Sequence, residues 1–269
     1  MHGLPSIKIG DVKISKIVCG TNPFFGYSHF TRARDIWMKE YFTDDRIREV
    51  VERCADLGVN AVLSGNNERL YGILRELSKE GREIHWICTP GGSNAEEVKE
   101  EVRWCADHDV RICMPHQMYT DHNLVTSRND LLGYDGIAEL IRSLGMIPGL
   151  STHRPETIPS MDRAGKDVET YVLPFNSTGF LSGVEVEWVR KVINESPKPV
   201  IGIKPLAAGR ITPEIGLPFV LRSMKERDAV AVGFSSVLEV EEDMEIVSGV
   251  ISDRRGDIPL STSRSKSVF

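Results

Sequence analysis

The stretch Gly58–Leu74, GVNAVLSGNNERLYGIL, contains the unit from which the whole chain is built, a strand that runs into a helix. An apolar run at Ala61–Leu63 is followed by small polar residues at Ser64–Asn67, and a helical spacing of apolar residues begins at Leu70. In proteins made of repeated strand–helix units, such turns carry catalytic side chains. This turn offers only amides, a hydroxyl and one carboxylate, so we expect the chemistry at other turns.

The same alternation of strand and helix patterns recurs along the chain. Eight apolar runs predict strands at Ile17–Cys19, Ala61–Leu63, Ile84–Cys88, Val110–Met114, Ile147–Leu150, Tyr171–Phe175, Val200–Ile203 and Ala229–Phe234. Helical patterns separate them at Asp44–Leu57, Glu68–Lys79, Ala95–Asp107, Tyr134–Leu144, Pro155–Ala164, Val184–Asn194, Pro213–Lys225 and Leu238–Val250. Continuously apolar strands are typical of a covered parallel sheet. Eight such units predict one (β/α)8 TIM barrel domain over residues 1–269. A doubly wound open sheet is the alternative, but no GxGxxG turn follows the first strand.

Some segments lie outside this repeat. Short alternating runs at Ile7–Ile9 and Val12–Ile14 predict an N-terminal β-hairpin. The loops Asn22–Phe42 and His116–Gly133 exceed the usual connection length and are candidate lids or binding loops. The C-terminal tail, residues 252–269, is polar and serine-rich.

Composition excludes several classes of protein. With 41% apolar and 27% charged residues, the chain is an ordinary soluble globular protein, and its net charge of −6 argues against a nucleic-acid partner. No apolar run is long enough for a membrane span, and the first residues do not resemble a signal peptide. The five cysteines contain no CxxC pair, so we expect no disulfide framework and a cytoplasmic location.

Polar residues follow most of the predicted strands. Because the strand ends of a barrel share one rim, these residues are the candidate site. They are, in chain order, Thr21, Asn22 and His29; Asn66 and Asn67; His116 and Gln117; Ser151, Thr152 and His153; Asn176; Lys204 and Arg210; and Gly233, Ser235 and Ser236. Three of the seven histidines fall on this rim, which is the main functional clue.

Several of these turns together resemble the aldo-keto reductases, a (β/α)8 family that reduces carbonyls with NADPH and without a metal. The resembling segments are IVCGTNPFFG, GVNAVLSG with NNERLYGIL, GMIPGLSTHRPETI, LPFNS, KPLAAGRITP and AVGFSSVLEVEED. They occur in the family's order and at its spacing over most of the chain. The resemblance implies the barrel fold and a small-molecule substrate at its mouth.

The resemblance also implies a catalytic set of Tyr, Asp, Lys and His, from which this chain departs. The Asp position holds Leu63, Asn66 and Asn67 stand where the segment that bears the Tyr is shortened, and the Lys position holds Pro90. Only the histidine is retained, as His116. A neutral amide cannot deliver a proton as a tuned phenol does. We therefore expect any activity to depend on His116, assisted by His29 and Lys204.

The family's cofactor residues are retained in part. The pair that holds the nicotinamide amide matches Ser151 and Thr152, with Thr in place of Asn, and the family's Gln on strand six matches Val172. Thr21 and the strand-eight turn, Gly233, Ser235 and Ser236, complete the candidate cofactor residues. The turn opens a helix whose free N–H groups can bind an anion. The acidic residues Glu239, Glu241 and Glu242 disfavour the 2′-phosphate of NADP, whereas NAD or a simple phosphate stays compatible.

Other interpretations of these residues remain open. His29, His116 and His153 could bind zinc or iron, although no HxH or HxxxH spacing supports a metal site. His29 is also a candidate turn-capping residue, and His153 is a candidate structural residue beside Thr152, the expected N-cap of the next helix. Lys204 could form a Schiff base in apolar surroundings, or pair with Glu68 or a bound anion.

The amides Asn22, Asn66, Asn67, Gln117 and Asn176, together with Arg210, suit a polyol or sugar-type ligand, although amides are also common in turns. We therefore expect an atypical oxidoreductase-like enzyme that acts on a small polar carbonyl or sugar-type substrate. The alternatives are a non-redox lyase, isomerase or hydrolase, with or without a metal, and a catalytically inactive ligand-binding barrel. The sequence does not indicate the oligomeric state.

Overall fold

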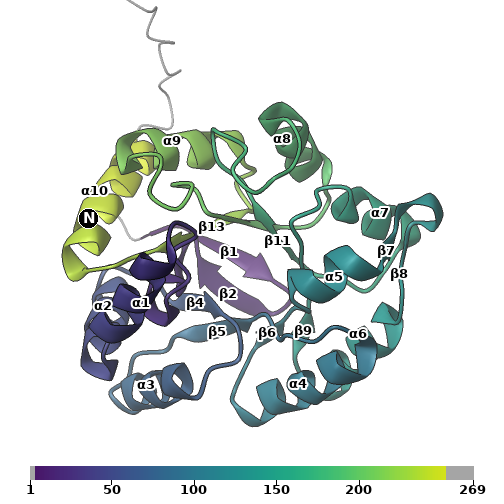
Figure 1. The fold of residues 1–269 in the computed structure, drawn as a ribbon, viewed down its shortest axis with the longest axis horizontal. Helices are drawn as coiled ribbons and strands as arrows, with labels where there is room; N and C mark the ends of the chain where they lie inside the picture. Colours follow the sequence, from purple (N-terminus) through teal and green to yellow (C-terminus); the bar gives the residue numbers. More distant parts are fainter. Residues whose placement is uncertain (1–3, 253–269) are drawn as a thin grey trace, which may run out of the picture.

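The structure is a computed structural model that describes residues 4–252, and it confirms the barrel predicted from the sequence (Figure 1). The predicted polar tail therefore lies outside the described residues, except for Ser252. The parallel strands are β3 (Ile17–Gly20), β4 (Ala61–Ser64), β5 (His85–Cys88), β6 (Ile112–Cys113), β9 (Ile147–Pro148), β10 (Leu150–Ser151), β11 (Tyr171–Pro174), β12 (Val200–Ile203) and β13 (Ala229–Gly233). They pair in the order β10-β11-β12-β13-β3-β4-β5-β6-β9.

The ring closes through Gly149, which separates β9 from β10. β9 pairs with β6 and β10 pairs with β11, so these two short strands occupy one position and the nine strands fill eight positions around the barrel. A Cβ atom on Gly149 would lie 2.6 Å from Cγ of Met114 and 2.8 Å from the carbonyl oxygen of Thr170. Only glycine leaves room for this close approach.

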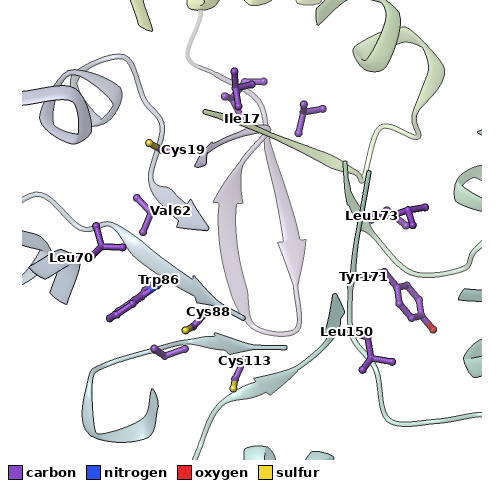
Figure 2. Close-up of a cluster of buried hydrophobic side chains, with 14 of the residues drawn as sticks. Ile17, Cys19, Val62, Leu70, Trp86, Cys88, Cys113, Leu150, Tyr171 and Leu173 are labelled. Atoms are coloured by element: carbon purple, nitrogen blue, oxygen red, sulfur yellow. The ribbon is translucent and has the colours of Figure 1, made fainter. Parts of the chain in front are cut away.

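Helices cover the outside of the barrel (Figure 1). They are α2 (Asp44–Asp56), α3 (Glu68–Lys79), α4 (Ala95–Asp107), α6 (Tyr134–Ser143), α7 (Thr157–Ala164), α8 (Val186–Glu195), α9 (Pro213–Ser223) and α10 (Val237–Ser252). In α3 the buried residues are Leu70, Ile73, Leu74 and Leu77, the spacing of one helix face. Figure 2 shows the matching layer of strand side chains, such as Trp86 and Cys113, directed outward from the strands.

The N-terminal hairpin, β1 (Ser6–Ile9) and β2 (Val12–Ser15), crosses the centre of the barrel in Figure 1. Its apolar residues alternate with exposed ones, and Ile9 and Ile14 are completely buried in a cluster with inward-facing barrel residues. A Cβ on Gly10 at the hairpin tip would lie 2.8 Å from Cδ1 of Ile147, the first residue of β9. The hairpin therefore closes the end of the barrel where the strands begin.

The two long loops contain helices that the sequence patterns did not predict. The first holds a 3-10 turn, η1 (Pro23–Phe25), and α1 (Arg32–Tyr41), in which Met38 is the buried residue. The second holds α5 (Gln117–Asn123), the strands β7 (Leu124–Val125) and β8 (Asp130–Leu131), and η2 (Thr126–Arg128) between them. Helix α1 was missed because it has no apolar stripe, since Ile36 and Trp37 are exposed.

Two further features bear on the sequence interpretation. All five cysteines are free and buried. Within residues 4–252, no helix has both the length and the apolar character that a membrane span requires.

We expect Ile14→Ala to lower the free energy of unfolding by about 2–5 kcal/mol, because it leaves a cavity in the sealed end of the barrel. Lys13→Ala, at the exposed neighbouring position, should change it by less than about 0.5 kcal/mol. Urea unfolding measures both. Equal effects of the two substitutions would show that the hairpin does not pack as described.

Candidate active site

The open end of the barrel, where the strands end, is called the mouth here, and Lys204 stands at its wall. Lys204 follows β12 directly and has φ of +60°, in the left-handed region. Ala207, Ala208 and Gly209 in the same turn also have positive φ. Non-glycine residues adopt this region rarely, and such strained turns are concentrated at functional sites.

Burial sets the charge state of Lys204. The residue is half-buried, and desolvation lowers the pKa of its amine to about 8. The pairing with Glu68 considered from the sequence is wrong. The carboxylate of Glu68 instead accepts hydrogen bonds from Nε1 of Trp104 at 3.1 Å and contacts Nε2 of His108 at 3.1 Å.

Three histidines share the mouth with Lys204. Burial is the first cause that lowers the pKa of His29, His116 and His153, and the Lys204 charge is the second cause for each. The pKa of His153 falls to about 4, because His116 and His29 add to these effects. The turns after β3, β6, β10 and β12 therefore bring four basic groups together, and the charge of Lys204 disfavours protonation of each of the three histidines.

His116 is the N-cap of α5, and this contact fixes its tautomer. Its Nδ1 accepts a hydrogen bond from the backbone N–H of Met118 at 3.3 Å. Nδ1 must therefore be unprotonated, and in the neutral ring the proton is on Nε2. The lowered pKa keeps this ring neutral at pH 7.

Arg210 holds the loops around the mouth together. Its Nη2 donates to the carbonyl oxygen of His29 at 3.0 Å, and its Nη1 donates to that of Ala207 at 3.1 Å. The guanidinium also lies over the rings of Phe180 and Phe30, at 4.4 and 5.1 Å from their centroids. Through these contacts the side chain of Arg210 joins three loops. Arg210 was a candidate for substrate binding.

The rim amides have mixed environments. Asn66 points towards α4, where its Nδ2 donates to Glu101 and its Oδ1 accepts from Sγ of Cys88. Asn67 caps α3 through Leu70 N–H. Asn176 is buried and bonded to the backbone of Thr178 and Phe180. These three amides therefore serve local structure.

Two amides remain nearer to the mouth. Nδ2 of the exposed Asn22 lies 3.3 Å from Nε2 of His29, and the half-buried Gln117 begins α5 beside His116. They are the rim amides best placed to meet a substrate.

Asp121 in α5 is a residue of the site that the sequence interpretation missed. Its carboxylate accepts hydrogen bonds from the hydroxyl of Thr152 and the backbone N–H of His153. The predicted N-cap role of Thr152 is wrong, because α7 begins at Thr157 with Glu156 as its N-cap. Asp121 lies in a loop that gave no helical signal, and its partners are about thirty residues away in the sequence.

The strand-eight turn does not fit the phosphate of NADP. The backbone N–H of Ser235 donates to Oε2 of Glu239 at 2.6 Å, and Oγ of Ser236 accepts from the backbone N–H of Glu239 at 3.2 Å. This is a variant of the capping box, in which the carboxylate of Glu239 accepts from the residue before the N-cap and so occupies an N–H group expected to bind an anion. A phosphate here would also meet the negative charge of Glu242, so we derive no step through this cofactor.

Of the other candidate cofactor residues, Thr21 and Ser151 are buried. Thr21 donates from its hydroxyl to the carbonyl oxygen of Leu63 at 2.9 Å, and Ser151 is 4% exposed. Gly233, at the end of β13, is exposed.

The three histidines are not arranged as a metal site. Within residues 4–252, no group of three or more His, Cys, Asp or Glu side chains has the arrangement needed to hold a metal ion. The zinc or iron alternative considered for His29, His116 and His153 is therefore not supported.

Comparisons with known proteins agree with the fold. Neither a protein-family model nor a curated protein sequence matches the chain. A solved structure of a Pseudomonas aeruginosa protein assigned to the aldo-keto reductases is similar over 93% of this chain and 99% of its own, with a TM-score of 0.68 and 15% identity. The holo form of an aldo-keto reductase from Bacillus halodurans covers 91% of this chain and 90% of its own, with a TM-score of 0.60 and 13% identity.

A third similar structure is a variant of Gox0644 in complex with NADPH. It covers 93% of this chain and 92% of its own, with a TM-score of 0.60 and 13% identity. At these identities the comparisons establish the fold alone. The chain has the barrel fold of the aldo-keto reductases, as its turn motifs implied.

We expect Asp243→Asn to stabilise the protein at pH 8 by about 4 kcal/mol. Burial, followed by the charges of Glu239, Glu242 and Glu214, raises the pKa of Asp243 to about 7. The folded state therefore disfavours the ionised carboxylate, and the penalty grows as the pH rises from the unfolded pKa near 4 through 7. The gain from the substitution should disappear between pH 7 and pH 4.

Urea unfolding at pH 5 and pH 8 measures this difference, with Glu245→Gln on the exposed face of the same helix as the control. A gain that is equal at both pH values would contradict the assignment.

Proposed function

We propose that this chain is an enzyme that acts on a small polar carbonyl or sugar-type substrate at the mouth of its barrel, with His116 in the acid–base role. The observation that supports this most strongly is the state of His116. Its ring is neutral, its Nδ1 is bonded to the backbone, and Nε2–H is left for a substrate beside Lys204. A neutral imidazole fixed in this tautomer can donate a hydrogen bond to a carbonyl oxygen.

The surrounding groups suit a developing negative charge on that oxygen. No acidic group contributes to the pKa of His116, His153 or Lys204, so the ammonium form of Lys204 is not neutralised by a nearby carboxylate. A fixed cation in a half-buried site stabilises charge on oxygen more strongly than it would in water. His116 and Lys204 would thus polarise a bound aldehyde or ketone without the Tyr of the family.

The oxidoreductase form of this proposal needs an external hydride donor. The capping box at Ser235 and Glu239 disfavours the phosphate of NADP, so the proposal concerns binding and polarisation of the carbonyl. A small-molecule substrate is the partner that it requires.

We expect NADPH to raise the melting temperature no more than NADH does, because the additional 2′-phosphate meets Glu239, Glu241 and Glu242. Thermal-shift titration of the purified protein with the two cofactors measures this. A clearly larger shift with NADPH would show that the strand-eight turn opens to admit the phosphate.

Activation of the carbonyl can be measured without knowing the complete reaction. A polarised carbonyl releases the proton on the neighbouring carbon more readily, so the enzyme should catalyse deuterium incorporation from D2O into dihydroxyacetone, followed by NMR. We expect His116→Asn to slow this exchange by about 100-fold or more. Asparagine is a good N-cap, so the fold should persist.

His122→Gln is the matched control, because His122 is an exposed histidine on the same helix. It should leave the exchange rate unchanged. In the wild type the rate should change as the pH falls below 6.5, through the lowered pKa of His116, and the Asn variant should lack this step. Equal exchange rates in the wild type and the His116 variant would contradict the proposed role.

A further inference from the structure

We infer that Lys204 is a covalent residue whose amine forms an imine with the carbonyl substrate held at the mouth, an inference that rests on the proposed function. It adds a nucleophile to a site in which His116 polarises the carbonyl. The substrate class is an aldehyde or ketone small enough to enter the mouth and to reach the end of β12.

The first observation is that Lys204 lacks the counter-ion that comparable lysines have. Within residues 4–252, the other buried or half-buried lysines are Lys16, Lys99, Lys166, Lys198 and Lys225, and each has a polar partner. Four of them pair with a carboxylate, as Lys166 does with Asp135 at 2.7 Å. No described residue forms an ion pair or hydrogen bond with Nζ of Lys204. A structural lysine in this environment would be paired.

The second observation is the accessibility of the amine. Within the described residues, a buried side-chain nitrogen or oxygen without a partner occurs only in Arg82. Nζ of Lys204 also has no partner, but it is not one of these buried atoms. It is therefore accessible to solvent in the mouth. An unpaired amine that can be reached from outside is what a nucleophile requires.

The third observation is that the backbone beneath Lys204 is held firmly. Its carbonyl oxygen accepts the N–H of Ala207 at 2.9 Å, and Arg210 ties Ala207 to the backbone of His29. The left-handed conformation at Lys204 and Ala207 is maintained by these contacts. A reactive side chain works best when its support is fixed before the substrate binds.

The electrostatic environment agrees with this geometry. A lysine with a pKa of about 8 has about a tenth of its amine uncharged at pH 7, against about 0.03% for an ordinary lysine. The groups that sense the Lys204 charge are His29, His116 and His153, and with lowered pKa values all three are largely neutral at pH 7. They would tolerate the single positive charge of a protonated imine.

The step balances without an oxidant or a reductant. Uncharged Nζ attacks the carbonyl carbon, a C–N bond forms, and the π electrons of the carbonyl move to oxygen, which takes a proton from Nε2 of His116. The nitrogen returns a proton to the imidazole. The hydroxyl then takes a second proton from solvent and leaves as water, and the nitrogen lone pair completes the C=N bond of a protonated imine. Addition of water reverses the sequence and restores Lys204.

Borohydride trapping tests this inference on the full-length protein. Dihydroxyacetone or glycolaldehyde is added at pH 7–8, sodium borohydride reduces any imine, and mass spectrometry locates the adduct. We expect one adduct, heavier by the mass of the carbonyl compound less one oxygen atom, on the peptide that contains Lys204. Lys204→Arg should lose this adduct and retain the melting temperature. Lys8→Arg, at an exposed lysine of the hairpin, should retain the adduct.

The outcomes separate this inference from the function on which it rests. If dihydroxyacetone raises the melting temperature and its deuterium exchange depends on His116, but no adduct forms on Lys204, the covalent role is overturned and the proposed function stands. If neither probe shifts the melting temperature, exchanges or forms an adduct, both fail. Adducts that are equal in the wild type and in Lys204→Arg also overturn the inference, because they would come from other lysines.

Discussion

Closure of a ring of parallel strands is the constraint on which the rest of this structure depends. The ring can close only because Gly149 lets the chain pass within contact distance of Met114 and Thr170. Parallel strands then all end on one side, and the apolar hairpin with Ile9 and Ile14 fills the other side. The candidate catalytic side chains are therefore gathered at a single rim, although they are far apart in the sequence.

The mouth that results combines three largely neutral histidines with one lysine whose charge is weakened by burial. Burial opposes the charge on His29, His116, His153 and Lys204, and the amine of Lys204 adds its repulsion to each ring. A nearby carboxylate favours the charged forms, and Asp35 partly offsets the lowering of the His29 pKa. The carboxylate of Asp121 is engaged by the hydroxyl of Thr152 and the N–H of His153. This charge distribution is what the proposed polarisation of a carbonyl by His116 and Lys204 depends on.

The sequence predicted those elements whose signals are local. Helix α3 was predicted with its observed bounds because Asn67 caps its start and its apolar residues keep one face. Helix α1 failed this test because a stretch with one buried residue carries no helical period. The direction of a side chain after a strand was not predictable either. Asn66 follows its strand as closely as any rim residue, but its amide is used by Glu101 and Cys88 on the outer side.

The capping box was present in the sequence as Ser236 followed three residues later by Glu239. Whether this motif blocks an anion site depends on the hydrogen bond from the N–H of Ser235 to Glu239, which only the structure shows. The same residues could leave that N–H free. The unpaired state of Lys204 is likewise a three-dimensional fact. The place of Lys204 after a strand predicted that it lies on the rim, but not that it lacks a partner such as Asp228, with which Lys225 pairs at 3.0 Å.

The pairing of β3 with β13 has a consequence for synthesis of the chain. Val18 in β3 lies opposite Ala231 in β13. The first barrel strand therefore cannot complete its pairing until the last one has been synthesised. At about 5–20 residues per second, a ribosome needs on the order of 10–40 seconds to make the intervening segment. Throughout this time β3 keeps an apolar edge without its final neighbour, and such edges promote aggregation. The nascent chain is therefore exposed to misassembly until β13 has been synthesised.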